Sequence, residues 1–103
     1  MKKSLLILIV SLFFTSAAWA QQSQPADVLE AAQRGDQEAQ LEMGILYEFG
    51  FFMPDHAIPA LAWYMLSAEQ GNQKAIKRRD LLLSRMSQSE IDQAQSQSSQ
   101  LLR

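Results

Sequence analysis

AAQRGDQEAQ (residues 31–40) and SAEQGNQKAI (residues 67–76) are two copies of one pattern, 36 positions apart. Each copy has a small residue before a glycine, a glutamine two positions after the glycine, and an alanine further on. The four identical pairs are Ala32 and Ala68, Gly35 and Gly71, Gln37 and Gln73, and Ala39 and Ala75. A helix-turn-helix repeat needs these positions fixed, because its turn uses a glycine and its packed helices need small residues.

The two residues that follow the glycines, Asp36 and Asn72, are good N-caps. Their side-chain oxygens can accept a hydrogen bond from a free amide of the first helical turn. A period of this length is typical of α-solenoids, which usually serve as binding surfaces. The repeat therefore favours a binding protein over an enzyme.

Residues 1–20 have the pattern of an export signal. Lys2 and Lys3 precede an apolar run, residues 5–14, and Ala18-Trp19-Ala20 supplies the small residues that a signal peptidase recognises. We expect cleavage after Ala20 and a periplasmic or secreted protein. The alternative is an uncleaved anchor, but a membrane-spanning helix needs about 20 apolar residues, and this run is shorter. The chain has no cysteine, which excludes a lipoprotein anchor and a disulfide framework.

The expected mature chain is small and acidic. Removing twenty of 103 residues leaves 83, with seven of the nine Lys and Arg against eleven Asp and Glu, a net charge of −4. This balance gives no reason to expect nucleic acid as a partner. A chain of this size is near the limit for one apolar core without staples, so a partner or self-association is expected to support it.

The chain reads as helices joined by short turns. After a flexible lead over residues 21–25, we expect helices over about 26–34, 37–50, 57–70 and 73–86, with a turn at residues 51–55. Gly44 lies inside the second helix, where it would let a neighbouring helix approach closely. The expected buried positions are Ala39, Met43, Leu46, Tyr47 and Gly50, then Ala60, Trp63, Tyr64, Ser67 and Ala68, then Ala75, Leu82, Leu83 and Met86.

The tail over residues 87–103 is rich in Gln and Ser, so disorder is one reading of it. Against disorder, Ser87 and Glu90 have the spacing of a capping box. Apolar or small residues then recur at helical spacing, at Ile91, Ala94, Ser98 and Leu101. We therefore predict a terminal capping helix over 88 to about 97.

Several of these segments resemble a Sel-one-like repeat (SLR), the tetratricopeptide-related helical repeat. The similar segments are AQLEMGILYEFG (39–50), Pro54, ALAWY (60–64) and AEQGN (68–72), and residues 75–82 and 86–95 resemble the closing segment of bacterial members. The resemblance assigns residues 26–86 to the repeat region and residues 87–103 to a cap and tail. Phe52 and His56 depart from the family pattern, at positions that usually hold glycine and aspartate.

The resemblance implies an all-α fold, a short right-handed superhelix with a C-terminal cap. It also implies an adaptor or scaffold in the bacterial envelope and no catalytic residues. Members described as acting on β-lactams are cysteine-rich, which this chain is not.

The sequence contains few groups that could support catalysis. His56 is the only histidine, so a zinc site cannot be assembled, and the glycines do not form a phosphate-binding loop. His56 beside Asp55 could orient a serine, although we favour a solvated histidine in a turn. We expect no enzyme activity, no metal and no other cofactor. The alternative is an envelope hydrolase or cell-wall-binding accessory that uses the repeat as a frame.

Three groups of residues are candidates for binding a partner. Phe51, Phe52 and Met53 form an apolar turn, which would either pack under the next repeat or anchor a partner. A basic stripe would be either a solvated face, partly compensated by Glu69, or a docking strip for an acidic partner or anionic phospholipid headgroups. The residues of this stripe are Lys74, Lys77, Arg78 and Arg85.

The third candidate is a groove lined by Glu42, Tyr47 and Tyr64, whereas Trp63 is expected in the core. We predict that a peptide or helix of an envelope or secreted protein docks against the inner helices. Two copies of the chain could also stack end to end, because a repeat buries its apolar face only against a neighbour.

Overall fold

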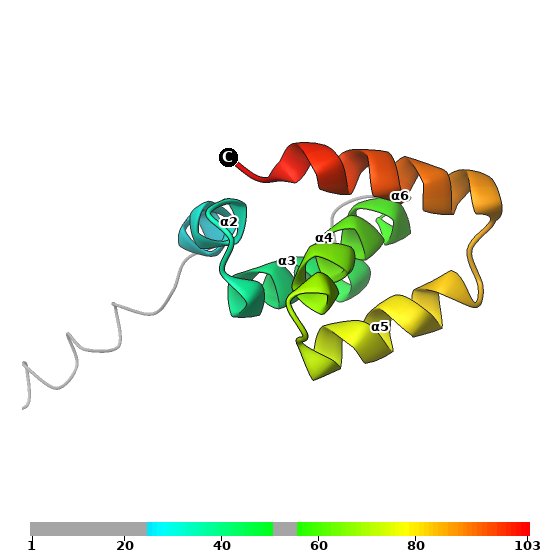
Figure 1. Ribbon diagram of the computed structural model, residues 1–103, viewed down its shortest axis with the longest axis horizontal. Coiled ribbons are helices and arrows are strands. Elements are labelled where there is room, and N and C mark those ends of the chain that lie inside the picture. Colours follow the sequence, from blue (N-terminus) through cyan, green and yellow to red (C-terminus); the bar gives the residue numbers. More distant parts are fainter. Residues whose placement is uncertain (1–24, 51–55) are drawn as a thin grey trace, which may run out of the picture.

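The structure is a computed structural model that describes residues 25–50 and 56–103 (Figure 1). Regular structure in these two ranges is entirely helical, which confirms the all-α prediction. The helices are α2 (Pro25–Gln33), α3 (Gln37–Phe49), α4 (Ala57–Glu69), α5 (Gln73–Leu83) and α6 (Gln88–Leu101). The export signal and most of the flexible lead lie outside the described residues. No helix within the two ranges is long and apolar enough to cross a membrane.

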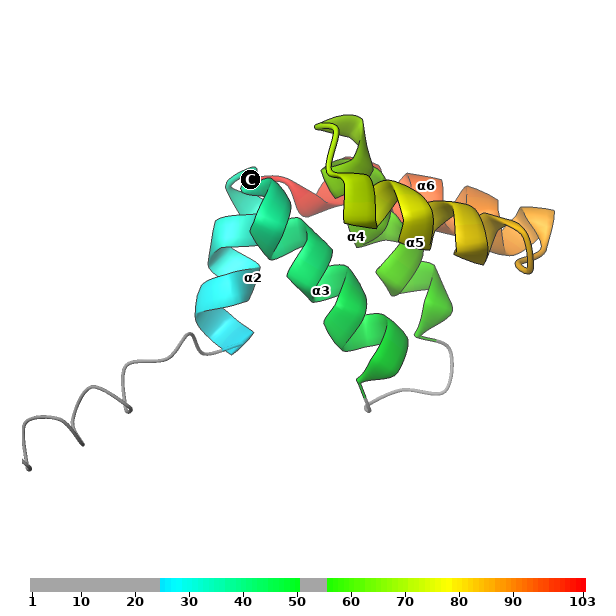
Figure 2. The same ribbon diagram turned by 90° about the horizontal axis from the view of Figure 1, so that it is seen from below.

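Helix α4 lies at the centre of a compact unit of five helices. In Figure 1 it runs between α5 and α6, and in Figure 2 α3 and α5 lie in front of α4 and α6. All five buried positions expected for α4 are confirmed, and Leu61, Ala62 and Leu66 are buried as well. Helix α4 therefore supplies more of the core than any other described helix, while the right-handed superhelix stays a prediction.

The repeated turns have the geometry expected of them. Gly35 and Gly71 have φ angles of 107° and 89°, in the region that favours glycine. Oδ1 of Asp36 accepts a hydrogen bond from the Ala39 amide at 2.9 Å, and Asn72 accepts one from the Ala75 amide at 3.0 Å. The two N-cap predictions are thus confirmed, and α3 and α5 begin in equivalent ways.

Amide side chains, the buried Gln40 and the exposed Gln70, connect the first turn to the end of α4. The Gln40 amide group donates to the Ala32 carbonyl at 3.1 Å, and the Gln70 amide group donates to Gln40 at 2.8 Å and to the Gly35 carbonyl at 2.9 Å. The Ser67 hydroxyl donates to the Gln37 carbonyl at 2.8 Å. These bonds satisfy polar groups that would otherwise be costly to bury, and they fix α4 against the turn between α2 and α3.

The expected close approach at Gly44 is confirmed. A Cβ atom added there would overlap Cδ1 and Cε1 of the fully buried Tyr64 ring. The missing side chain lets α3 and α4 pack with the ring of Tyr64 against the α3 backbone.

The predicted capping helix is present and continues past residue 97 to Leu101. Its capping box is complete: the Glu90 amide donates to Ser87 Oγ at 3.2 Å, and the Ser87 amide donates to Glu90 Oε1 at 2.8 Å. The helix is longer than predicted because its last turn is held in place. Leu101 packs against the core, and the Arg103 amide donates to the Gln33 carbonyl of α2 at 2.9 Å.

Replacing Ser87 with alanine is expected to lower the free energy of unfolding by about 1 kcal/mol, because it removes one half of the capping box. Urea titration followed by circular dichroism measures this loss. Ser89→Ala is the matched control. Ser89 is exposed, and its side chain makes no hydrogen bond to any described residue. Equal losses for the two variants would contradict a capping role for Ser87.

Helix α5 ends three residues earlier than expected, at Leu83 rather than near Met86. The amides of Arg85 and Met86 still donate to the Leu82 carbonyl, at 3.1 and 3.0 Å. The chain therefore turns tightly after α5, and Met86 remains half-buried as expected.

Candidate interaction surface

The carboxylate of Glu48 joins three helices. Its side chain is 4 % exposed, and Oε1 accepts hydrogen bonds from the Tyr64 hydroxyl at 2.7 Å and from Arg78 Nε at 3.0 Å. Its second oxygen, Oε2, accepts from Nη2 of Arg78 and from Nη2 of Arg85, the latter at 3.1 Å. Glu48 thus links α3 to α4 and to both α5 and the turn after it.

The surroundings of Glu48 favour its ionised form. Burial by itself raises the pKa of this carboxyl group, but the hydrogen bonds from Arg78 and Tyr64 and the charges of Arg78 and Arg85 outweigh burial. The pKa of Glu48 is therefore lowered. Burial, and then the hydrogen bond to Glu48, raises the pKa of Tyr64, so its hydroxyl stays a donor. The hydrogen bond to Glu48 likewise raises the pKa of Arg78.

This cluster divides the predicted basic stripe. Arg78 and Arg85 are paired with Glu48, whereas Lys74 and Lys77 are exposed without a recorded ion pair in the described ranges. The compensating acid is Glu48 and not the expected Glu69. Sequence reasoning missed Glu48 because it lies 30 and 37 positions from its arginines.

The residues of the predicted groove differ in their exposure. Tyr64 is fully buried and Tyr47 is half-buried against the core, so only Glu42 is fully at the surface. Trp63 is buried, which confirms its expected place in the core. The apolar turn of Phe51, Phe52 and Met53 lies outside the described residues.

Three of the four large apolar side chains that are exposed in the described ranges lie on α3 and α5, and the fourth, Leu102, follows α6. Phe49 is 61 % exposed, Leu81 52 % and Ile45 39 %. The Arg78 guanidinium lies over the Phe49 ring, 4.9 Å from its centroid, which connects the two helices at the surface. We call the surface formed by these two helices the α3/α5 face; its residues are Glu38, Glu42, Ile45, Phe49, Lys74, Lys77, Arg78, Leu81 and Arg85.

A signal for this face was present in the sequence. Ile45 and Leu81 are 36 positions apart, which is the period of the repeat, and Leu81 lies within the basic stripe when α5 is drawn at 100° per residue. Both residues were passed over because they fall outside the buried stripe of each helix. An apolar residue at the same outward position of both repeats is the pattern that identifies them.

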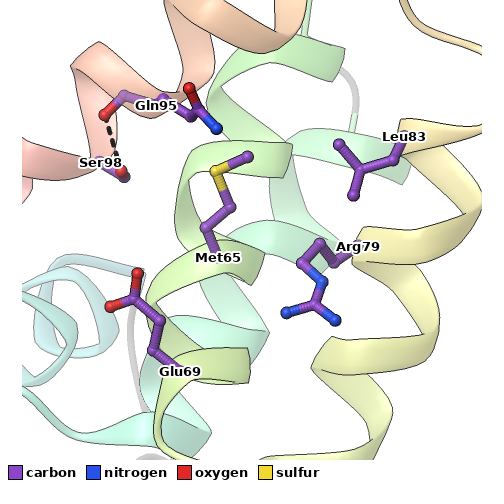
Figure 3. A pocket seen from close by; sticks show the side chains of 6 residues that line it. All are labelled: Met65, Glu69, Arg79, Leu83, Gln95 and Ser98. Atoms are coloured by element: carbon purple, nitrogen blue, oxygen red, sulfur yellow. Dashed lines mark hydrogen bonds between the residues drawn. The ribbon is translucent and has the colours of Figure 1, made fainter.

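A second feature is an open cleft of about 480 Å³ between α4, α5 and α6 (Figure 3). Met65 and Leu83 supply its apolar lining, and Glu69 and Arg79 supply opposite charges. Gln95 and Ser98 of α6 complete the lining, and the Ser98 hydroxyl donates to the Gln95 carbonyl at 2.8 Å. Arg79 also pairs with Asp80 at 3.1 Å, so the cleft has no strong excess of either charge.

Asp55, which the sequence places beside His56, lies outside the described residues. His56 occupies the N-cap position of α4, makes no capping hydrogen bond with its side chain, and has a buried Nδ1 without a partner within the two ranges. No group of three His, Cys, Asp or Glu in those ranges is placed to hold a metal ion.

No family profile, no curated protein and no solved structure matches this chain. The resemblance to Sel-one-like repeats therefore stays a prediction from the motifs. The comparisons and the structure together identify a small domain of five packed helices and no family.

Proposed function

We propose that this protein is an exported, non-catalytic protein-interaction module of the bacterial envelope. In this proposal it is a short right-handed superhelix of the Sel-one-like type, and its α3/α5 face receives the partner. The observation that carries the proposal is the group of exposed apolar side chains on that face, Ile45, Phe49 and Leu81. Three large apolar side chains at one surface, bordered by charges, are the composition of an interface anchor.

The contacts beneath the face support its use for binding. Arg78 is held by Glu48 from below and lies over Phe49 from the side, so the surface around Phe49 is fixed before a partner arrives. Ordering a flexible surface on binding costs free energy, and a surface that is already ordered avoids much of that cost.

The location and the partner are proposals that come from the sequence. The basic start, the apolar run and the Ala18-Trp19-Ala20 site support export, and an exported module would find its partner among envelope or secreted proteins.

A photoreactive benzoylphenylalanine placed at position 81 of the full-length protein tests this function in bacterial cells. We expect ultraviolet light to attach a discrete protein to position 81, because Leu81 lies on the α3/α5 face. The matched control places the same group at position 93, where Gln93 is exposed on α6. No adduct at position 81, or the same adducts at both positions, would contradict the proposal.

A further inference from the structure

The outward positions of α3 and α5 carry opposite charges at equivalent places. Glu38 of α3 corresponds to Lys74 of α5, Glu42 corresponds to Arg78, and Ile45 corresponds to Leu81, each 36 positions apart. The correspondence is structural as well, because both helices begin after the same glycine turn and the same type of N-cap. At these equivalent positions α3 is therefore acidic and α5 is basic, and each helix has one apolar residue at the third position.

The order of these residues along the two helices is also the same. The Asn72 amide group donates to Glu38 Oε1 at 3.0 Å, which brings the two helix beginnings together. Glu48, near the end of α3, binds Arg78 in the middle of α5 and Arg85 in the turn after α5, so long side chains also link the second halves of the two helices. Along each helix the charged residues come first, Glu38 and Glu42 in α3 and Lys74 and Lys77 in α5, and the apolar residues Ile45, Phe49 and Leu81 follow. Figure 2 shows α3 and α5 on the same side of the molecule.

Such a face is complementary to itself. A rotation of 180° about an axis in the plane of the face, running lengthwise between α3 and α5, sets α3 of one copy over α5 of another. Glu38 then lies opposite Lys74 of the other copy, Glu42 lies opposite Arg78, which is next to Lys77 in the sequence, and Ile45 lies opposite Leu81. The contact repeats on both sides of the axis, as in a closed two-fold dimer.

We infer that the α3/α5 face binds a second copy of this chain in this two-fold arrangement. The inference rests on the proposed function, because it names the partner of the same face. Burying Ile45, Phe49 and Leu81 supplies the apolar contact, and the charges fix which helix faces which.

The charges favour a second copy over an anionic partner. A lipid surface or an acidic peptide would be attracted by Lys74 and Lys77 but repelled by Glu38 and Glu42 of the same face. Glu48 moreover offsets part of the charge of Arg78 and Arg85, so the cationic side is weaker than the sequence indicates.

Sedimentation equilibrium of the protein expressed from its full-length sequence tests the inference. We expect a monomer–dimer equilibrium that weakens as salt is added, because exposed ion pairs are screened. In Glu38→Lys, and separately in Lys74→Glu, like charges face each other on both sides of the axis, and we expect the dissociation constant to rise at least about tenfold. Mixing these two variants is expected to restore dimers, since their faces are complementary again.

Gln93→Glu, on the exposed side of α6, is the control for added charge, and circular dichroism shows whether each variant keeps its helices. A monomer at every concentration up to about 1 mM would overturn the inference, and so would a dimer that the charge reversals leave unchanged. A monomer that still forms a discrete adduct with another protein at position 81 would overturn the second copy as partner and leave the proposed function standing. A monomer without any such adduct would overturn both.

Discussion

Gly44→Ala is expected to lower the free energy of unfolding by about 1–3 kcal/mol, although alanine is the better helix former. The added Cβ overlaps two ring carbons of Tyr64, and this ring is fully buried with its hydroxyl bound to Glu48. The ring therefore cannot move away without loss of packing or of that hydrogen bond. Chemical denaturation followed by circular dichroism measures the change.

Two further variants separate the overlap from helix propensity. Ser96→Ala changes an exposed position of α6 and is expected to be nearly neutral. In a Tyr64→Leu background, Gly44→Ala is expected to cost much less, because the ring carbons are gone. A cost that stays the same in that background would contradict the overlap as its cause.

Glu48→Ala is expected to lower the free energy of unfolding by about 3 kcal/mol, at the lower end of the cost of removing one partner from a buried ion pair. The variant leaves the Tyr64 hydroxyl and two guanidinium groups without their acceptor. The cost stays at the lower end because Arg85, with 64 % of its side chain exposed, can turn to water. Glu42→Ala is the control on the same helix, since Glu42 is exposed.

The same carboxylate makes stability depend on pH. The pKa of Glu48 is lowered in the folded protein from its usual 4.5, so its contribution is fully present above pH 4.5 and is lost as the pH falls through the folded value. We expect the free energy of unfolding to decrease below pH 4.5, and to decrease less steeply in Glu48→Gln. Parallel pH profiles of the wild type and this variant would contradict the assignment.

Local features were predictable from the sequence. The glycine turns, the N-caps at Asp36 and Asn72 and the capping box at Ser87 depend on residues within a few positions of one another. The close approach at Gly44 was also predictable, because a glycine inside a helix costs stability unless something packs against it. The caps account for the beginnings of three of the five described helices, α3, α5 and α6.

Contacts between distant residues were not predictable in the same way. Helix α4 is buried on several sides, because α3, α5 and α6 all pack against it. The spacing of apolar residues in the sequence predicts only one buried side of a helix. Glu48 was missed for a related reason. A carboxylate on a helix is normally solvated, and only the packing of both α3 and α5 against α4 brings its arginines within reach.

The site itself was predicted in part. Lys74, Lys77 and Arg85 were expected at the surface and are exposed there, whereas Tyr64 is in the core. Phe49 was not among the candidates, because an exposed apolar residue without an apolar counterpart in the other repeat cannot be told from a buried one until the neighbouring helices are placed.

The hydrogen bond from the Arg103 amide to the Gln33 carbonyl has a consequence for folding kinetics. It joins residues 70 positions apart, whereas most contacts in a helical bundle are close in sequence. Contacts between distant residues form slowly, since closing a long loop costs entropy before any contact repays it. The last turn of α6 and the end of α2 should therefore be ordered late, after α3, α4 and α5 have assembled.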